Sequence, residues 1–198
     1  NHNTNEHDMK IFVTVCIYPN KCKYSGNWSN GYHDGFGIFV TPENAAYAGE
    51  WRRNKKHGLG RYYFPNGDFY DGSFHSDNAD GHGVYRYKDS ENVFLGAWKK
   101  DKRNGKGCYL WKNGSKYDGY WLDNDIDGKG VFEFATGAKY AGNFKKNLKH
   151  GNGVFIWPTG NKYSGQFKDD KLEGTGEMIY AGGHVHTGLW SNNKKNGR

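Results

Sequence analysis

The stretch Tyr140-Ala141-Gly142-Asn143-Phe144 places an aromatic residue, a glycine and a second aromatic residue at alternating positions. Seven residues after Phe144, the run Gly151-Asn152-Gly153-Val154-Phe155-Ile156-Trp157 continues the alternation with two glycines and two more aromatic residues. Alternation with a period of two is typical of β-strands rather than helices. We therefore predict that each copy of this pattern forms a two-stranded antiparallel hairpin.

The pattern occurs eight times along the chain, with spacings of 23 or 24 residues, which indicates a repeat protein. We assign the additional residue of the two longer spacings to the turns at Asp89-Ser90-Glu91 and Gly182-Gly183-His184. An insertion within a strand would instead move its side chains to the opposite face. The copies begin at Tyr24, Tyr47, Tyr70, Phe94, Tyr117, Tyr140, Tyr163 and Thr187, the last being a degenerate copy, Thr187-Gly188-Leu189-Trp190.

The composition predicts an unusual core. Of 198 residues, 30 are glycine, and aromatic residues make up 17% of the chain against 35% for all hydrophobic residues. Rings on one face of the hairpins would therefore pack over bare glycine backbone. A single hairpin is marginally stable, so stacking of neighbours must supply the stability.

Two segments are expected from the extent of the pattern. Residues 24–198 form the array of eight repeats, the last one incomplete. Residues 1–23 form a polar segment, in which residues 11–18 are the second strand of a degenerate repeat that caps the array.

The motif resembles a known family. Tyr47-Ala48-Gly49-Glu50-Trp51 followed by Lys56-His57-Gly58-Leu59-Gly60 is similar to a MORN (membrane occupation and recognition nexus) repeat, and the resemblance covers about residues 24–198. It implies an all-β fold, an extended, twisted, single-layer antiparallel sheet of stacked hairpins. Members of the family look like scaffolds at membrane–cytoskeleton junctions, in the radial spoke heads of cilia and in parasite cytoskeletal rings. Others are accessory domains of lipid kinases or protein methyltransferases, and phospholipid binding is often proposed for the family.

The formal net charge of +7 is compatible with anionic lipid, nucleic acid or acidic protein partners. The six residues that follow the second aromatic residue of each copy alternate in net charge, negative in odd-numbered repeats and positive in even-numbered ones. Two interpretations stay open. Neighbouring loops could neutralise each other, or the basic loops could form a strip for anionic lipid or a protein partner. The candidate residues for the second interpretation are Arg52, Arg53, Lys55, Lys56, Lys99, Lys100, Lys102, Arg103, Lys145, Lys146 and Lys149.

The aromatic face is expected to serve mainly as core, with a groove for a partner helix or strand as the alternative. Residues with a plausible exposed edge in that groove are Trp51, Trp98, Trp111, Trp121 and Trp157. Aromatic residues beside basic ones also suggest single-stranded nucleic acid. Because the repeat itself accounts for these aromatics, we expect no nucleic-acid partner.

The sequence offers little sign of metal, cofactor or catalytic chemistry. The pairs Cys16/Cys22 and His184/His186 lack standard zinc spacing, and His57, His82 and His150 recur beside the glycine motif as structural residues. We find no phosphate loop, nucleophile elbow, metalloprotease motif or paired acid and base. We therefore expect no cofactor, no metal and no enzymatic activity.

The leading hypothesis is a structural and interaction scaffold that binds cytoskeletal or ciliary proteins, its own copy, or membranes. The alternatives are a tethering module for anionic phospholipid and an accessory domain of a larger lipid kinase or methyltransferase. Three cysteines without dense spacing fit a reducing compartment, and no segment is long and apolar enough to span a membrane. We expect a cytoplasmic protein associated with the cytoskeleton or a membrane.

Overall fold

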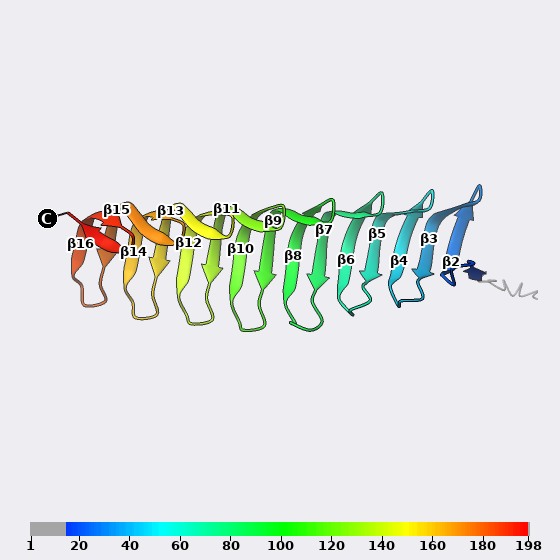
Figure 1. Ribbon diagram of the computed structural model, residues 1–198, viewed down its shortest axis with the longest axis horizontal. Coiled ribbons are helices and arrows are strands. Elements are labelled where there is room, and N and C mark those ends of the chain that lie inside the picture. The colour runs from blue at the N-terminus through cyan, green and yellow to red at the C-terminus, as the bar shows by residue number, and fades with distance from the viewer. Residues whose placement is uncertain (1–14, 198) are drawn as a thin grey trace, which may run out of the picture.

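The computed structural model describes residues 15–197, which form a single antiparallel sheet of seventeen strands. Each strand pairs with the next one along the chain, so the hairpins lie side by side in one row from β2 to β17 (Figure 1). A short first strand, β1 (Val15–Ile17), pairs with β2. The strands that open the hairpins are β2 (Lys23–Ser29), β4 (Ala46–Arg52), β6 (Phe69–His75), β8 (Val93–Lys99), β10 (Lys116–Leu122), β12 (Lys139–Lys145), β14 (Lys162–Lys168) and β16 (Val185–Ser191). The strands that close them are β3 (Tyr32–Val40), β5 (Lys55–Tyr63), β7 (Asn78–Arg86), β9 (Lys102–Leu110), β11 (Asp125–Glu133), β13 (Leu148–Ile156), β15 (Lys171–Ile179) and β17 (Lys194–Asn196).

The predicted fold class is confirmed, because the sheet is open, all-β and built from hairpin repeats. Among the described residues, no helix is long and apolar enough to cross a membrane. Of the expected capping segment 11–18, residues 11–14 lie outside the described part of the chain. Val15, Cys16 and Ile17 form β1.

The hairpin turns are shorter than the sequence suggested. The sequence predicts loops for the six residues after each second aromatic residue, but the turn itself has two residues. In the second hairpin these are Arg53 (φ 48°) and Asn54 (φ 66°). Two consecutive positive φ values define the type I′ turn, which matches the twist of the flanking strands. Lys55 onward already belongs to β5, so most of these charged residues are strand residues.

The two positions of the Gly-x-Gly motif require glycine for different structural reasons. In the hairpin of β4 and β5, Gly49 pairs with Gly60, whereas Trp51 pairs with Lys56, so β5 bulges between those pairs. The first glycine, Gly58, lies in this bulge with a φ of 57°, a conformation that glycine adopts without steric cost. The second glycine of each motif lies under an aromatic ring.

The ring over the second glycine belongs to the first aromatic residue of the repeat. A Cβ built on Gly142 would lie 2.5 Å from the Tyr140 hydroxyl oxygen and 2.6 Å from the Cα atom of Gly153. The Tyr140 hydroxyl donates to the backbone oxygen of Asn143 at 2.9 Å. Close approach of the ring to two strands therefore requires glycine at both positions. Equivalent rings are fully buried in seven repeats, at Tyr24, Tyr47, Tyr70, Phe94, Tyr117, Tyr140 and Tyr163.

Neighbouring repeats are joined through the same face, which we call the ring face. The Tyr140 ring packs edge-on against Phe144 of its own repeat and against Phe167 of the next, both at 5.0 Å between centroids. Where the second aromatic residue is tryptophan, its Nε1 donates to the second glycine of the preceding repeat, as from Trp121 to Gly107 oxygen at 3.1 Å. The core is therefore a continuous row of rings rather than a set of separate clusters.

A second set of contacts joins neighbouring hairpin turns. Asn147 accepts a hydrogen bond through Oδ1 from the Ile126 backbone N–H at 2.8 Å, and its own N–H donates to the Ile126 oxygen at 2.9 Å. We call this reciprocal pair of hydrogen bonds the turn latch. It recurs between all successive hairpins, and the side-chain acceptors are Asn54, Asp77, Asp101, Asn124, Asn147, Asp170 and Asn193.

The eighth repeat begins one residue earlier than the sequence pattern suggested. His186 pairs with Met178 and Gly188 with Gly176, as Tyr163 pairs with Phe155 and Gly165 with Gly153 in the preceding repeat. His186, not Thr187, therefore takes the place of the first aromatic residue, and the last spacing is 23 residues. The turn at Gly182–His184 consequently holds no additional residue.

Only the third spacing contains an insertion. The Tyr87 N–H donates to Asn92 oxygen, five residues on, whereas in the other turns the corresponding bond spans four residues, as from Phe64 to Asp68. The prediction for residues 89–91 is therefore right. The eighth repeat, expected to be incomplete, has a closing strand of three residues, β17.

Candidate interaction surfaces

Ten aromatic rings form a continuous strip along the ring face. Successive centroids lie 4.3–6.0 Å apart from β5, the closing strand of the second hairpin, to the end of β13. Nine of these rings are half-buried and therefore partly exposed to solvent, whereas Tyr109 is buried. The members of this aromatic strip are Tyr62, Phe64, Tyr85, Tyr87, Tyr109, Trp111, Phe132, Phe134, Phe155 and Trp157. Eight strand steps of about 4.8 Å give the strip a length of about 38 Å.

The five tryptophans proposed as groove residues separate into two groups. Trp51, Trp98 and Trp121 are 8%, 8% and 5% exposed and belong to the core, so the expectation of an exposed edge is wrong for them. Trp111 and Trp157 are half-buried members of the aromatic strip. Both kinds face the same side of the sheet. Trp51, Trp98 and Trp121 are buried because each packs on rings of the preceding repeat and donates its Nε1 hydrogen bond to a glycine there, as Trp51 does with Tyr24 and Gly37.

Three of the eleven basic residues proposed for a lipid or partner strip also lie on the ring face. The Lys56 ammonium lies 4.3 Å from the Tyr62 ring centroid, and the Arg103 guanidinium carbon lies 4.5 Å from that of Trp121. Cations at these distances are attracted by the ring quadrupole. Burial lowers the pKa of Lys56, and the carboxylates of Asp77 and Asp101 oppose that shift.

The third cation, Lys149, lies 5.9 Å from the Phe155 centroid and forms an ion pair with Asp170 at 2.7 Å. Its side chain is only 18% exposed. These three cations are therefore engaged with rings or carboxylates of the array. The other eight basic residues are exposed at or beside the hairpin turns, at Arg52, Arg53, Lys55, Lys99, Lys100, Lys102, Lys145 and Lys146.

The alternating charge of the turns has a structural counterpart. A carboxylate of an odd-numbered repeat accepts from the backbone N–H of the first turn residue in the following repeat. Examples are Asp34 with Arg53 at 3.3 Å and Asp127 with Lys146 at 3.2 Å. Turns of opposite charge are therefore neighbours in direct contact, which favours the neutralisation interpretation.

One residue of the ring face was not singled out from the sequence. His33 is buried, stacks on Tyr24 at 3.6 Å, and its Nε2 lies 2.6 Å from the Tyr18 hydroxyl oxygen. Burial lowers the pKa of His33. It takes the place that Lys56 has in the next repeat, five residues after the second aromatic residue, and that spacing is the signal that could have identified it.

The residues considered for metal binding do not assemble. Within residues 15–197, no three His, Cys, Asp or Glu side chains come close enough to hold a metal ion. Cys16, Cys22 and Cys108 are free thiols. His57 and His150 are half-buried and His82 is exposed, each beside the first glycine of a Gly-x-Gly motif or between the two.

Sequence comparison agrees with the hairpin geometry. The MORN repeat family model matches eight consecutive segments, residues 24–44, 47–69, 70–91, 94–116, 117–139, 140–162, 163–185 and 186–198. The chain belongs to the MORN-repeat family. The last segment starts at His186, in accord with the strand register. MORN repeats are a non-catalytic fold that acts as a scaffold for binding. A search of curated proteins found no match to this chain.

Two solved structures that match this MORN array share little sequence with it, and both TM-scores are below 0.5. The TCP domain of SAS-4 from Drosophila melanogaster, solved with a proline-rich motif of Ana2, is 9% identical with a TM-score of 0.48. The match covers 94% of this chain and 96% of that one. The TCP10 domain of CPAP from Danio rerio, solved with a STIL peptide, is 13% identical with a TM-score of 0.34. That match covers 89% of this chain and 83% of the CPAP chain.

Proposed function

We propose that this MORN array is a non-enzymatic cytoplasmic scaffold that holds a segment of a cytoskeletal or ciliary protein along its ring face. The observation that carries the proposal is the aromatic strip, in which ten rings, nine of them half-buried, follow one another over about 38 Å. Aromatic side chains are enriched at the centres of protein interfaces because they bury large areas at low entropic cost. A strip of this length accommodates an extended segment of about 11 residues.

Trp111 and Trp157 allow a matched test. The residues directly before them, Leu110 and Ile156, are 44% and 40% exposed and point to the opposite face. We expect the purified chain to co-sediment with microtubules or actin filaments at physiological salt. The double variant Trp111→Ala/Trp157→Ala should weaken that binding at least tenfold, whereas Leu110→Ala/Ile156→Ala should leave it unchanged. Equal effects of the two double variants, or no sedimentation with either polymer, would contradict the proposal.

The second candidate is a module that tethers anionic phospholipid, and the exposed basic turn residues favour it. Turns with the same sign of charge are two hairpins apart, or about 19 Å. This distance exceeds the Debye length of about 8 Å at physiological salt, so the basic turns are screened from one another and each would attract anionic lipid separately. Co-sedimentation with phosphatidylserine vesicles separates the candidates. Salt-resistant binding that disappears in Lys99→Gln/Lys100→Gln/Lys145→Gln/Lys146→Gln would replace the protein scaffold with a membrane module. Light scattering of the protein without vesicles measures its mass in solution. Comparison with the chain mass of 22.5 kDa tests whether the chain binds its own copy as a homodimer.

A further inference from the structure

The face opposite the rings, which we call the outer face, carries one row of side chains that differs from repeat to repeat. These are the central residues of the Gly-x-Gly motifs, and all of them are exposed. In chain order the row, which we call the variable row, reads Phe36, Leu59, His82, Lys106, Lys129, Asn152 and Thr175. Successive members lie two strands apart, or about 10 Å. The row is therefore apolar over the first two repeats, cationic over the fourth and fifth, and neutral polar beyond them.

The apolar section carries neighbouring apolar side chains that are exposed to solvent. Phe36, Ile38 and Leu59 are 66%, 52% and 63% exposed on β3 and β5. They border a depression of about 760 Å³ whose floor is the backbone of the paired glycines, such as Gly37 and Gly49. Single exposed apolar residues are ordinary, but neighbouring ones around a depression indicate a contact surface.

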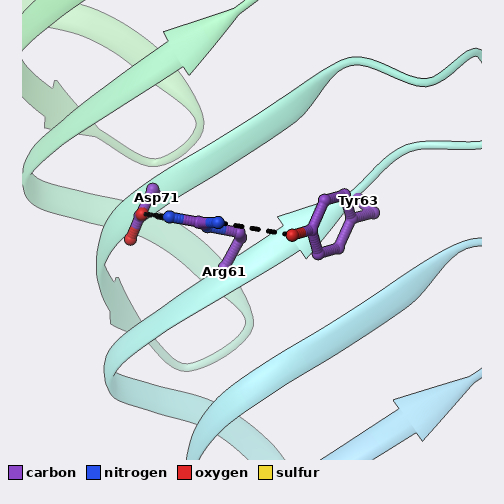
Figure 2. Close-up of polar contacts among 3 residues, drawn as sticks. All are labelled: Arg61, Tyr63 and Asp71. Atoms are coloured by element: carbon purple, nitrogen blue, oxygen red, sulfur yellow. Dashed lines mark hydrogen bonds and ion pairs between the residues drawn. The ribbon is translucent and has the colours of Figure 1, made fainter.

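Arg61, a cation among the described residues that line this depression, is neutralised within the sheet. Figure 2 shows Arg61 held between Asp71 and Tyr63. Its Nε donates to Asp71 Oδ2 at 2.9 Å, and Nη1 donates to the Tyr63 hydroxyl at 3.3 Å. These bonds raise the pKa of Arg61. The guanidinium therefore has its carboxylate partner already, and the section offers apolar contact rather than free charge.

The cationic section has the opposite character. Lys106, Lys116 and Lys129 border a depression of about 1010 Å³ between β9 and β14. Within residues 15–197, none of these three lysines has a carboxylate oxygen within 4.0 Å, whereas Lys139 at the same depression is paired with Glu133 at 2.8 Å. Three unpaired ammonium groups around one depression favour an anionic occupant.

We propose that the outer face binds one segment of a partner protein, with large apolar side chains over Phe36 and Leu59 and acidic side chains over Lys106 and Lys129. Leu59 lies two repeats from Lys106 and three from Lys129, or about 19 and 29 Å. An extended segment covers these spans in about six to nine residues. The partner segment therefore has its acidic residues six to nine positions from its apolar ones.

A protein segment fits this face better than a membrane surface does. Asp118 and Glu133 lie among the lysines of the larger depression, and a uniformly anionic surface would be repelled by both. Apolar and cationic sections also follow one another along the row, whereas a membrane-inserting patch would have cations around its apolar centre. This surface is separate from the ring face, so its occupant is additional to the partner proposed above.

The test begins with a displayed library of random 16-residue peptides selected on the intact chain. We expect enrichment of sequences with two large apolar residues six to nine positions from a cluster of Asp or Glu. Failure to enrich any sequence, or enrichment of acidic sequences without the apolar pair, would overturn the proposal.

The enriched peptide is then measured by fluorescence anisotropy against paired variants. Phe36→Ser/Leu59→Ser and Lys106→Glu/Lys129→Glu should each weaken binding at least tenfold. The charge-reversed chain should recover binding to a peptide in which Lys replaces the acidic residues, and this recovery excludes misfolding as the cause of the loss. Trp111→Ala, on the ring face, should change the affinity less than twofold, and a larger change would assign the peptide to the ring face and overturn the proposal.

Vesicles containing phosphatidylserine serve as the competing probe. At physiological salt they should displace less than a tenth of the bound peptide. Complete displacement that depends on Lys106 and Lys129 would make the outer face a membrane surface and overturn the proposal.

Discussion

The ring face and the outer face are built by the same strands, yet they vary to very different degrees. The first aromatic position of the repeat is Tyr in six copies, Phe94 in one and His186 in one. On the outer face, the variable row changes from Phe36 through Lys106 to Thr175. The ring face is constrained because each ring touches two strands and the next repeat. The outer positions contact mainly solvent, so they are free to differ and to carry specificity.

The largest loss of stability is expected from a methyl group added beneath a ring of the ring face. Gly142→Ala places a Cβ 2.6 Å from the Cα atom of Gly153, a backbone contact that cannot rotate away. We expect a loss of about 3 kcal/mol in the free energy of unfolding, measured by urea denaturation. Gly182→Ala is the matched control, because a Cβ there has no neighbour within 4 Å and should be neutral or slightly stabilising. Equal stability of the two variants would refute the close-packing account.

The turn latch gives the next largest effect. In Asn147→Ala, the Ile126 N–H loses its acceptor and residue 147 keeps a φ of 70° without the side chain that tolerates it. We expect a loss of about 1–2 kcal/mol. Asn147→Gly removes the acceptor but relieves the backbone, so it should lose less.

Asn152→Ala, at an exposed position on the outer face, is the control for the turn-latch variants and should stay within about 0.5 kcal/mol of the parent chain. Thermal unfolding followed by circular dichroism measures all three variants. A loss in Asn152→Ala as large as that in Asn147→Ala would mean that the latch is not responsible.

The repeat architecture was predictable because its signals are local. Alternating aromatics with Gly-x-Gly determine the strands and faces, and residues 89–91 mark the insertion. The aromatic pattern places the start of the eighth repeat one residue too late, because His186 stands where the other copies have tyrosine or phenylalanine. The basic segments resemble loops in sequence because they are rich in charged residues, although a strand with one exposed face is polar at every second position.

The surfaces were less predictable than the fold. Trp51 and Trp111 lie on the same face, but rings of the preceding repeat bury Trp51, whereas Trp111 contacts Phe132 of the following repeat and stays half-buried. The same limit applies to Lys56, Arg103 and Lys149, whose side chains turn onto rings and not outward. Burial of this kind depends on contacts between repeats, which a pattern within one repeat does not contain.

A reciprocal pair of substitutions sharpens the comparison within the ring face itself. Tyr140→Phe removes the hydroxyl that donates to Asn143 oxygen at 2.9 Å and should cost about 1 kcal/mol. Phe94 lies over Gly107 as Tyr117 lies over Gly130, so Phe94→Tyr should place a hydroxyl near the Ala97 oxygen and stabilise the chain by up to about 1 kcal/mol. Urea denaturation of both variants measures the change. Destabilisation by Phe94→Tyr would show that the fourth repeat has lost the space for a hydroxyl.

The smallest expected effect is a pH dependence confined to the first repeat. Burial lowers the pKa of His33 below that of the unfolded chain, about 6.5. Above pH 6.5 the imidazole is neutral in both states and its contribution to stability is complete. As the pH falls below 6.5, the unfolded state binds a proton that the folded state does not. The free energy of unfolding should then decrease by at most about 1.4 kcal/mol per pH unit, until the folded-state pKa is reached.

Hydrogen exchange of the β2 and β3 amides between pH 7.5 and 5, corrected for intrinsic rates, should show this opening while β12 and β13 stay protected. His33→Gln should abolish the difference between the two regions, and its persistence in that variant would assign the pH dependence to the carboxylates of the turns.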